Sequence, residues 1–177
     1  MSLETLNTLI GTATVLAQIA TLGLIALYFM REPKFEKLLV RWALLISFLF
    51  ATFGVVMSLV YSEYFGIIPC GLCWLGRIFL YPQAIMFAIA SWKRDANIAS
   101  YSIALSVCGL LVSLYHHNLQ MGGASVLPCP ASGAGDCAQR FLFEYGYVTF
   151  PLVGATSFAL LIVLMLFVRR AAAVPSN

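Results

Sequence analysis

The chain has 177 residues, of which 62% are hydrophobic and 10% are charged, and its formal net charge is +3. Soluble domains carry about 25% charged residues, so a chain this short and this apolar excludes a water-soluble globular fold. The basic residues form no face of the kind that binds nucleic acid, so no nucleic-acid partner is expected. The composition is typical of a protein embedded in a lipid bilayer.

Hydropathy divides the chain into five apolar runs. In chain order they are Leu6–Phe29, Leu38–Tyr61, Trp74–Trp92, Ile98–Asn118 and Val148–Val168. Each approaches the ~20 residues that cross the hydrocarbon layer as a helix, and backbone groups in lipid must be paired within the segment. The first run is too long for a signal peptide and no basic residue precedes it. The pattern therefore predicts an all-α integral membrane protein with five spans.

Lysine and arginine predict the orientation of these spans. Eight of the ten basic residues fall on one side of the membrane. They are Arg31, Lys34, Lys37, Arg41, Lys93, Arg94, Arg169 and Arg170. Only Arg77 and Arg140 lie toward the other side. Because cytoplasmic loops carry the excess of positive charge, we expect the N-terminus outside and the C-terminus in the cytoplasm.

Four of the five cysteines fall on the external face in this topology. Cys70 and Cys73 follow the second run, and Cys129 and Cys137 follow the fourth. That compartment permits disulfides, whereas the cytosol does not. Cys108 lies in the middle of the fourth run, and we expect it to be a small buried apolar residue.

The pair Cys70 and Cys73 is a poor structural staple, because so short a loop constrains the unfolded chain little. Cysteines at this spacing are more often redox-active. Pro69 and Gly71 allow a tight turn, and the N-terminal end of the following helix favours a thiolate. A c-type haem site would need His after Cys73, and that residue is Trp74.

The second pair, Cys129 and Cys137, is separated by "PASGAGD". Two glycines and a proline let this segment curl back, so a disulfide is feasible. Taken alone, the pair could equally be a structural disulfide that holds the loop or a redox-active pair. Its position on the same face as a C-x-x-C pair favours redox exchange.

Two further residues are candidates for binding a cofactor. Arg77 lies four residues after Cys73 and therefore on the same helix face. It either snorkels to lipid headgroups or places a cation beside a thiolate or a cofactor carbonyl. His116, next to His117, lies near the external end of the fourth run. There a histidine either packs at the interface or takes part in the function.

Three stretches carry a resemblance to a known family: "PCGLCWLGRIFLYP", "YHHNLQ" and "GDCAQRFLFEYGYVTFP". Together they resemble the DsbB family, disulfide bond formation protein B, including its BdbC-like members, over about Leu38–Val168. In the family motif the residue before the arginine is commonly Gln, and here it is Gly76. The second cysteine pair is also closer together than in enterobacterial members, and the first span is extra to the usual four.

The resemblance implies a four-helix redox bundle that binds a quinone, either ubiquinone or menaquinone, at its external end. Cys70 and Cys73 would be the pair that the quinone oxidises, with Cys73 as the thiolate at the quinone and Arg77 beside the ring. Cys129 and Cys137 would be the shuttle pair that oxidises a DsbA-like thiol oxidase. The protein would then be a quinone-dependent protein-disulfide oxidoreductase.

The resemblance also implies an organisation and a location. Residues 1–37 would be the extra N-terminal span with its cytoplasmic loop, residues 38–168 the redox bundle, and residues 169–177 a cytoplasmic tail. The protein would cross the bacterial plasma membrane, with both cysteine pairs on its external face.

Three other readings remain open at this stage. A vitamin K epoxide reductase-like enzyme also carries a C-x-x-C and a loop pair, but there the loop pair comes first. A membrane protein without enzyme activity could hold a structural zinc ion on the four external cysteines, although their spacing is irregular for zinc. A transporter is disfavoured because no span carries a carboxylate near its midplane.

Overall fold

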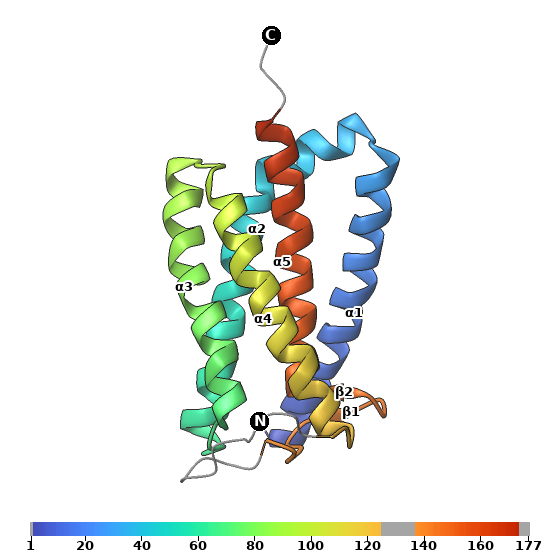
Figure 1. Ribbon diagram of the computed structural model, residues 1–177, viewed down its shortest axis with the longest axis vertical. Coiled ribbons are helices and arrows are strands. Elements are labelled where there is room, and N and C mark those ends of the chain that lie inside the picture. The colour runs from blue at the N-terminus through green and yellow to red at the C-terminus, as the bar shows by residue number, and fades with distance from the viewer. Residues whose placement is uncertain (1, 125–136, 174–177) are drawn as a thin grey trace.

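The computed structural model describes residues 2–124 and 137–173. Within these residues five long helices run side by side between the two ends of the molecule (Figure 1). They are α1 (Leu3–Met30), α2 (Pro33–Leu59), α3 (Gly71–Lys93), α4 (Ile98–Gln120) and α5 (Phe150–Ala172). A π-helical turn, η1 (Val60–Tyr64), continues α2. All five helices are long and apolar enough to cross a membrane, which confirms the predicted fold class.

Local sequence explains where the first two helices begin and end. The hydroxyl of Ser2 accepts a hydrogen bond from the backbone N–H of Thr5 and caps α1. Arg31 ends α1 in the left-handed conformation, with φ of 54°. Pro33 then starts α2, at a position where a missing N–H has no effect on the helix. The chain therefore reverses direction between α1 and α2 within a very short connection.

Helix α5 occupies the centre of the bundle and packs against α1, α2 and α4. In its most apolar stretch 61% of the residues are buried inside the protein, against 11% to 28% in the other four helices. Gly109 lets α4 lie close to α5, because a Cβ at this position would lie 2.4 Å from Cζ of Phe158. The other helices surround α5 and present one face to lipid.

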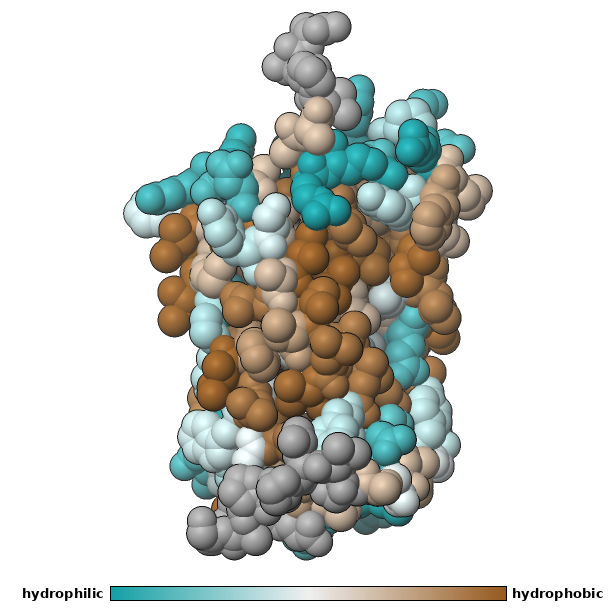
Figure 2. All heavy atoms as spheres, viewed as in Figure 1, coloured by the Kyte–Doolittle hydropathy of each residue, from teal (hydrophilic) through white to brown (hydrophobic). Residues whose placement is uncertain are grey.

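The surface shows the belt that a bilayer requires. Hydrophobic residues cover the middle of the molecule, and hydrophilic residues gather around the end that carries the C-terminus (Figure 2). Large apolar side chains such as Leu22 and Ile85 are about two-thirds exposed. Cys108 is exposed as well, so the prediction that it is buried was wrong. Its position on α4 faces outward, and a purely apolar helix gives no sign of which face lipid covers.

A small hairpin precedes α5. Strands β1 (Phe143–Glu144) and β2 (Val148–Thr149) pair antiparallel. Tyr145 and Gly146 turn the chain with positive φ angles of 55° and 77°. The fifth apolar run therefore begins as a strand and becomes helical only at Phe150.

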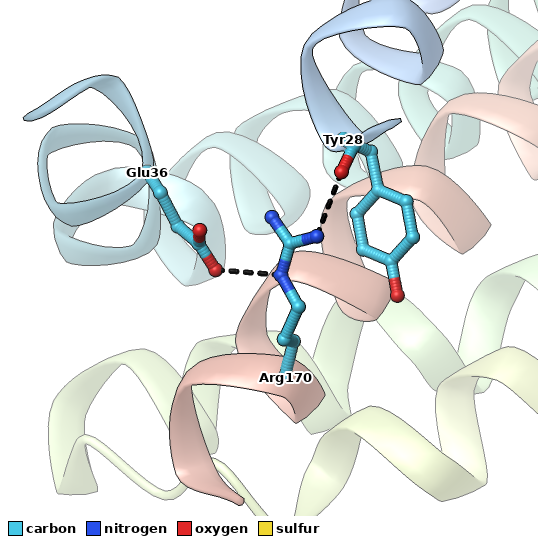
Figure 3. Close-up of polar contacts among 3 residues, drawn as sticks. All are labelled: Tyr28, Glu36 and Arg170. Atoms are coloured by element: carbon cyan, nitrogen blue, oxygen red, sulfur yellow. Dashed lines mark hydrogen bonds and ion pairs between the residues drawn. The ribbon is translucent and has the colours of Figure 1, made fainter. Parts of the chain in front are cut away.

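Arg170 joins three helices at the end of the bundle that carries the C-terminus (Figure 3). Its Nε donates to a carboxylate oxygen of Glu36 on α2 at 2.7 Å. A terminal nitrogen donates to the backbone oxygen of Tyr28 on α1, also at 2.7 Å. The guanidinium carbon lies 4.0 Å from the centre of the Tyr28 ring. One side chain of α5 thus fixes the turn between α1 and α2.

Replacing Arg170 with alanine is expected to lower the free energy of unfolding by roughly 1.5 to 3 kcal/mol, the range for hydrogen bonds to charged groups. Arg170→Lys should restore only part of this, because an ammonium lacks the planar fork. Thermal unfolding in detergent measures the effect. Arg169→Ala is the matched control, because Arg169 is the exposed neighbour with the same charge. Equal loss in the two alanine variants would contradict the role assigned to Arg170.

Candidate functional site

The turn between η1 and α3 places the C-x-x-C pair at a helix N-terminus, as predicted. Cys70 is the N-cap residue of α3, and its sulfur accepts a hydrogen bond from the backbone N–H of Cys73 at 3.3 Å. The two sulfurs lie 2.8 Å apart, which is longer than the ~2.05 Å of a disulfide. Both cysteines are free. The structure therefore holds the pair as a dithiol.

His116 of α4 lies between this dithiol and Cys137, the second cysteine of the pair that follows α4. Its Nε2 lies 3.7 Å from the sulfur of Cys70 and 3.0 Å from the backbone oxygen of Cys137. His116 is only 4% exposed and Cys137 only 2%. Cys137 takes part in a disulfide, and Cys129, its predicted partner, lies outside the described residues. One buried histidine therefore lies between the two predicted redox centres.

The surroundings of Cys70 favour its thiolate. A hydrogen bond from the Cys73 thiol contributes most, and a hydrogen bond from His116 and the charge of that ring add to it, while burial opposes them. Together they lower the pKa of Cys70 to about 4. Low thiol pKa values of this kind are typical of reactive cysteines at helix N-termini. In the reduced pair, the negative charge is therefore expected on Cys70.

Arg77 lies one turn along α3 from Cys73 and contacts α2. Its Nε donates to the hydroxyl of Ser58 at 3.0 Å, and a terminal nitrogen donates to the backbone oxygen of Ser58 at 3.1 Å. The guanidinium also lies over the Trp74 ring, 5.1 Å from its centre. Ser58 holds Arg77 in place within the bundle, which the alternative of a headgroup-bound arginine did not predict.

A cavity of about 250 Å³ unites these residues. Side chains from all five helices line it, and most of them are apolar. Four of the predicted site residues are among them, namely Cys70, Cys73, Arg77 and His116. The dithiol thus opens into a mostly apolar cavity inside the bundle, which a guanidinium and an imidazole also line.

Sequence reasoning missed several polar residues of this cavity, and two of them, Ser58 and Gln120, bear on its chemistry. The Gln120 side chain donates to the backbone oxygen of Gln139 at 2.9 Å. Its own oxygen is buried and has no hydrogen-bond partner in the part of the chain that the structure describes. Gln120 lies four residues after His116, and this spacing on one helix face is the signal that would have found it.

The positions of Cys70, Cys73 and His116 also bear on the alternative of a structural zinc site. The sulfurs of Cys70 and Cys73 and a ring nitrogen of His116 lie within 4.8 Å of one another, so these three could contribute to a soft metal site. A site of four cysteines would also need Cys137 as a thiolate. Because Cys137 is disulfide-bonded, this state of the protein does not offer that ligand set.

The acidity of Cys70 can be measured directly. Its alkylation rate should stay nearly constant between about pH 8 and pH 5, because an ordinary thiol titrates near pH 8.5 whereas a pKa of about 4 leaves Cys70 ionised above that value. The rate should then fall as the pH drops through about 4. His116→Phe should move the midpoint upward. Mass spectrometry of the fully reduced chain, alkylated for short times, gives the rate, and a midpoint near that of a free thiol would refute the assignment.

The chain is similar to known disulfide bond formation proteins. Residues 40–168 match the family model described as disulfide bond formation protein DsbB. The chain is 39% identical over 129 residues to a probable disulfide formation protein C of Bacillus cereus, which covers 72% of this chain and 88% of the relative. It is 38% identical over 117 residues to the SPbeta prophage-derived disulfide bond formation protein B of Bacillus subtilis, which covers 66% and 78%.

A third relative is the disulfide bond formation protein C of Bacillus subtilis, 30% identical over 131 residues, or 70% of this chain and 94% of the relative. No solved structure matches the chain. The matched residues contain the dithiol turn, Arg77 and His116, whereas α1 lies before them.

Proposed function

The chain belongs to the DsbB family of disulfide bond formation proteins, and on that premise we propose that it reoxidises a DsbA-like thiol oxidase and passes the electrons to a membrane quinone. The family match confirms the resemblance drawn from the motifs. The chain is a multi-pass membrane protein of disulfide bond formation. The proposal adds that the partner is a DsbA-like thiol oxidase, that the electron acceptor is a quinone, and that electrons pass from the partner to the quinone.

The observation that carries the proposal is the dithiol at the cavity. Cys70 and Cys73 begin a membrane-spanning helix, and both line an apolar cavity that also contains Arg77 and His116. A dithiol that served only soluble proteins would have no use for such a cavity. An acceptor that dissolves in lipid needs one within the span.

The residues of the cavity fit a quinone. A bound quinone supplies an acceptor for two electrons and two protons. Arg77 offers N–H donors for a ring oxygen. The unpartnered buried oxygen of Gln120 can accept a hydrogen bond from a hydroxyl of the reduced ring. Apolar side chains such as Phe53 and Met57 suit the rest of a lipid-soluble molecule.

Electrons reach the cavity by thiol–disulfide exchange. The Cys129–Cys137 disulfide oxidises the partner's dithiol, and the two loop cysteines become thiols. They then reduce the Cys70–Cys73 disulfide through a mixed disulfide. The contact of His116 with both Cys70 and the backbone of Cys137 favours Cys70 as the sulfur that the loop attacks. Cys73 is then released as a thiolate in the first turn of α3.

The second half of the cycle restores the C-x-x-C disulfide. Once both of its cysteines are reduced, Cys70 and Cys73 form their disulfide and lose two electrons and two protons to the acceptor. Arg77, one turn from Cys73, would place positive charge beside the C-x-x-C pair and near a quinone bound in the cavity. The loop pair is then ready for another partner.

The proposed orientation puts both cysteine pairs outside the plasma membrane. The start of α3, which carries the dithiol turn, lies at the end of the bundle opposite to the C-terminal end of α5, where hydrophilic residues gather (Figures 1 and 2). Arg169 and Arg170 lie at that C-terminal end of α5. By the positive-inside rule that basic end is cytoplasmic. An impermeant thiol label applied to reduced, intact cells should modify both pairs. Labelling of only one pair would contradict a relay on a single face.

The proposal is tested by reconstituting the reaction. The purified chain, a reduced DsbA-like protein and a quinone should yield partner disulfide and quinol in equal amounts, over many turnovers. Omission of the quinone should limit the reaction to the disulfides already present in the chain. Failure to form quinol, with either a ubiquinone or a menaquinone, would refute the proposed acceptor.

A further inference from the structure

One wall of the cavity comes from α1, which lies before the residues that match the DsbB family. Ile10, Ala13, Thr14 and Ala17 all line it. Their spacing of three, four and seven residues defines one face of a helix. Three of the four side chains are small, so this face leaves room beside α1 where larger residues would fill it.

Helix α1 is held in place along its length by polar contacts. Near its start, Asn7 donates to the backbone oxygen of Phe141 at 2.9 Å and accepts from the hydroxyl of Tyr61 at 2.8 Å. Further along, Gln18 donates to Thr156 of α5 at 3.2 Å and accepts from Tyr147 at 2.9 Å. The cavity wall that α1 provides is therefore a fixed part of the bundle.

The cavity extends from the dithiol toward the middle of the span. On α2 its lining runs from Ser58, which binds Arg77, back to Phe53 and Phe50. Eight residues of helix separate Phe50 from Ser58, a rise of about 12 Å. This extension is mostly apolar, and the small face of α1, on which the Thr14 hydroxyl donates to the backbone oxygen of Ile10, contributes to the same cavity. Its mostly apolar lining suits a hydrocarbon chain.

We propose that α1 and α2 together form the binding site for the isoprenoid tail of the quinone, and that Ala13, Thr14 and Ala17 determine how well long-tailed quinones fit. The inference rests on the proposed function and extends it to a helix that the family match does not include. The ring lies at the dithiol and Arg77, and the tail runs along α1 toward the bilayer centre. The extra helix is thereby a determinant of substrate specificity.

A larger side chain on this face tests the proposal. Ala17→Phe should raise the KM for ubiquinone or menaquinone with a full tail by about 5- to 150-fold, the range expected from overpacking a site. The KM for the same ring without a tail should not change. Ala26→Phe is the matched control, because Ala26 is an exposed residue on the opposite face of α1 that does not line the cavity. It should behave as the unmodified chain does.

A second measurement needs no turnover. A quinone with a photoreactive group on its tail should crosslink to the peptide that contains residues 10–17, and excess long-tailed quinone should prevent this. Crosslinks confined to other helices, or equal KM changes in Ala17→Phe and Ala26→Phe, would overturn the role of α1. If the unmodified chain reduced no quinone at all, the proposed function itself would fail. If it reduced quinone without tail crosslinks to α1, only this inference would fail.

Discussion

Replacing Cys73 with serine is expected to stop quinone-linked turnover while leaving one round of partner oxidation. The steady-state rate should fall by about 10³-fold or more, as it does when a nucleophile is removed from a catalytic unit. The shuttle disulfide of Cys129 and Cys137 does not need Cys73 for its first reaction. Each chain should therefore oxidise one partner dithiol in a rapid burst and then stop.

A quenched time course of partner disulfide measures both the burst and the later rate. Cys108→Ser is the matched control, because Cys108 is exposed on α4 and has no part in the relay. It should keep full turnover. Continued turnover in Cys73→Ser would remove the C-x-x-C pair from the path to the quinone. Loss of the burst as well would contradict the order of the two pairs.

Arg77→Ala should weaken quinone use far more than thiol exchange. The loss of a charge-assisted hydrogen bond corresponds to roughly 1.5 to 3 kcal/mol, or about 10- to 150-fold in the KM for quinone. Lysine should restore only part of this, because it has no planar set of donors. The single-turnover burst of partner oxidation should remain. Steady-state rates over a range of quinone concentrations, together with the burst, separate the two effects.

The contact between Arg77 and Ser58 supplies the control for a purely structural effect. Ser58→Ala removes the hydroxyl that accepts from Arg77 but leaves the guanidinium in the chain. If Arg77 acts on the quinone, its alanine variant should have a much higher KM than Ser58→Ala. If Arg77 only joins α3 to α2, neither variant should change the KM for quinone, and only their thermal stabilities should differ, because Ser58→Ala keeps the hydrogen bond from Arg77 to the backbone oxygen of Ser58.

The helices and the chemistry of the dithiol could be predicted because local sequence determines them. In lipid, a long apolar run can pair all its backbone groups only as a helix. The observed helices extend the predicted runs by only a few residues at most ends. Pro69 and Gly71 flank the N-cap residue Cys70, so the position of the thiols at a helix start also followed from sequence. The residues of the C-x-x-C motif carried the resemblance to the family.

Features that depend on packing could not be predicted. An apolar helix gives little sign of which face meets lipid, so Cys108 was expected inside and lies outside. The partner of Arg77 is set by how α2 and α3 lie together, and Ser58 had no motif to mark it. The hairpin strands are two residues each, too short for a periodic pattern. The wall that α1 adds to the cavity required the arrangement of all five helices.

The most direct test of the central claim isolates the C-x-x-C pair from the loop pair. A chain with Cys129→Ser and Cys137→Ser, fully reduced and freed of reductant, is mixed without oxygen with an equal amount of quinone. Quinol is then measured by its absorbance, and the Cys70–Cys73 disulfide by mass spectrometry. The account predicts one quinol for each Cys70–Cys73 disulfide formed. A disulfide that appears without quinol, or dithiols that persist beside unreduced quinone, would contradict it.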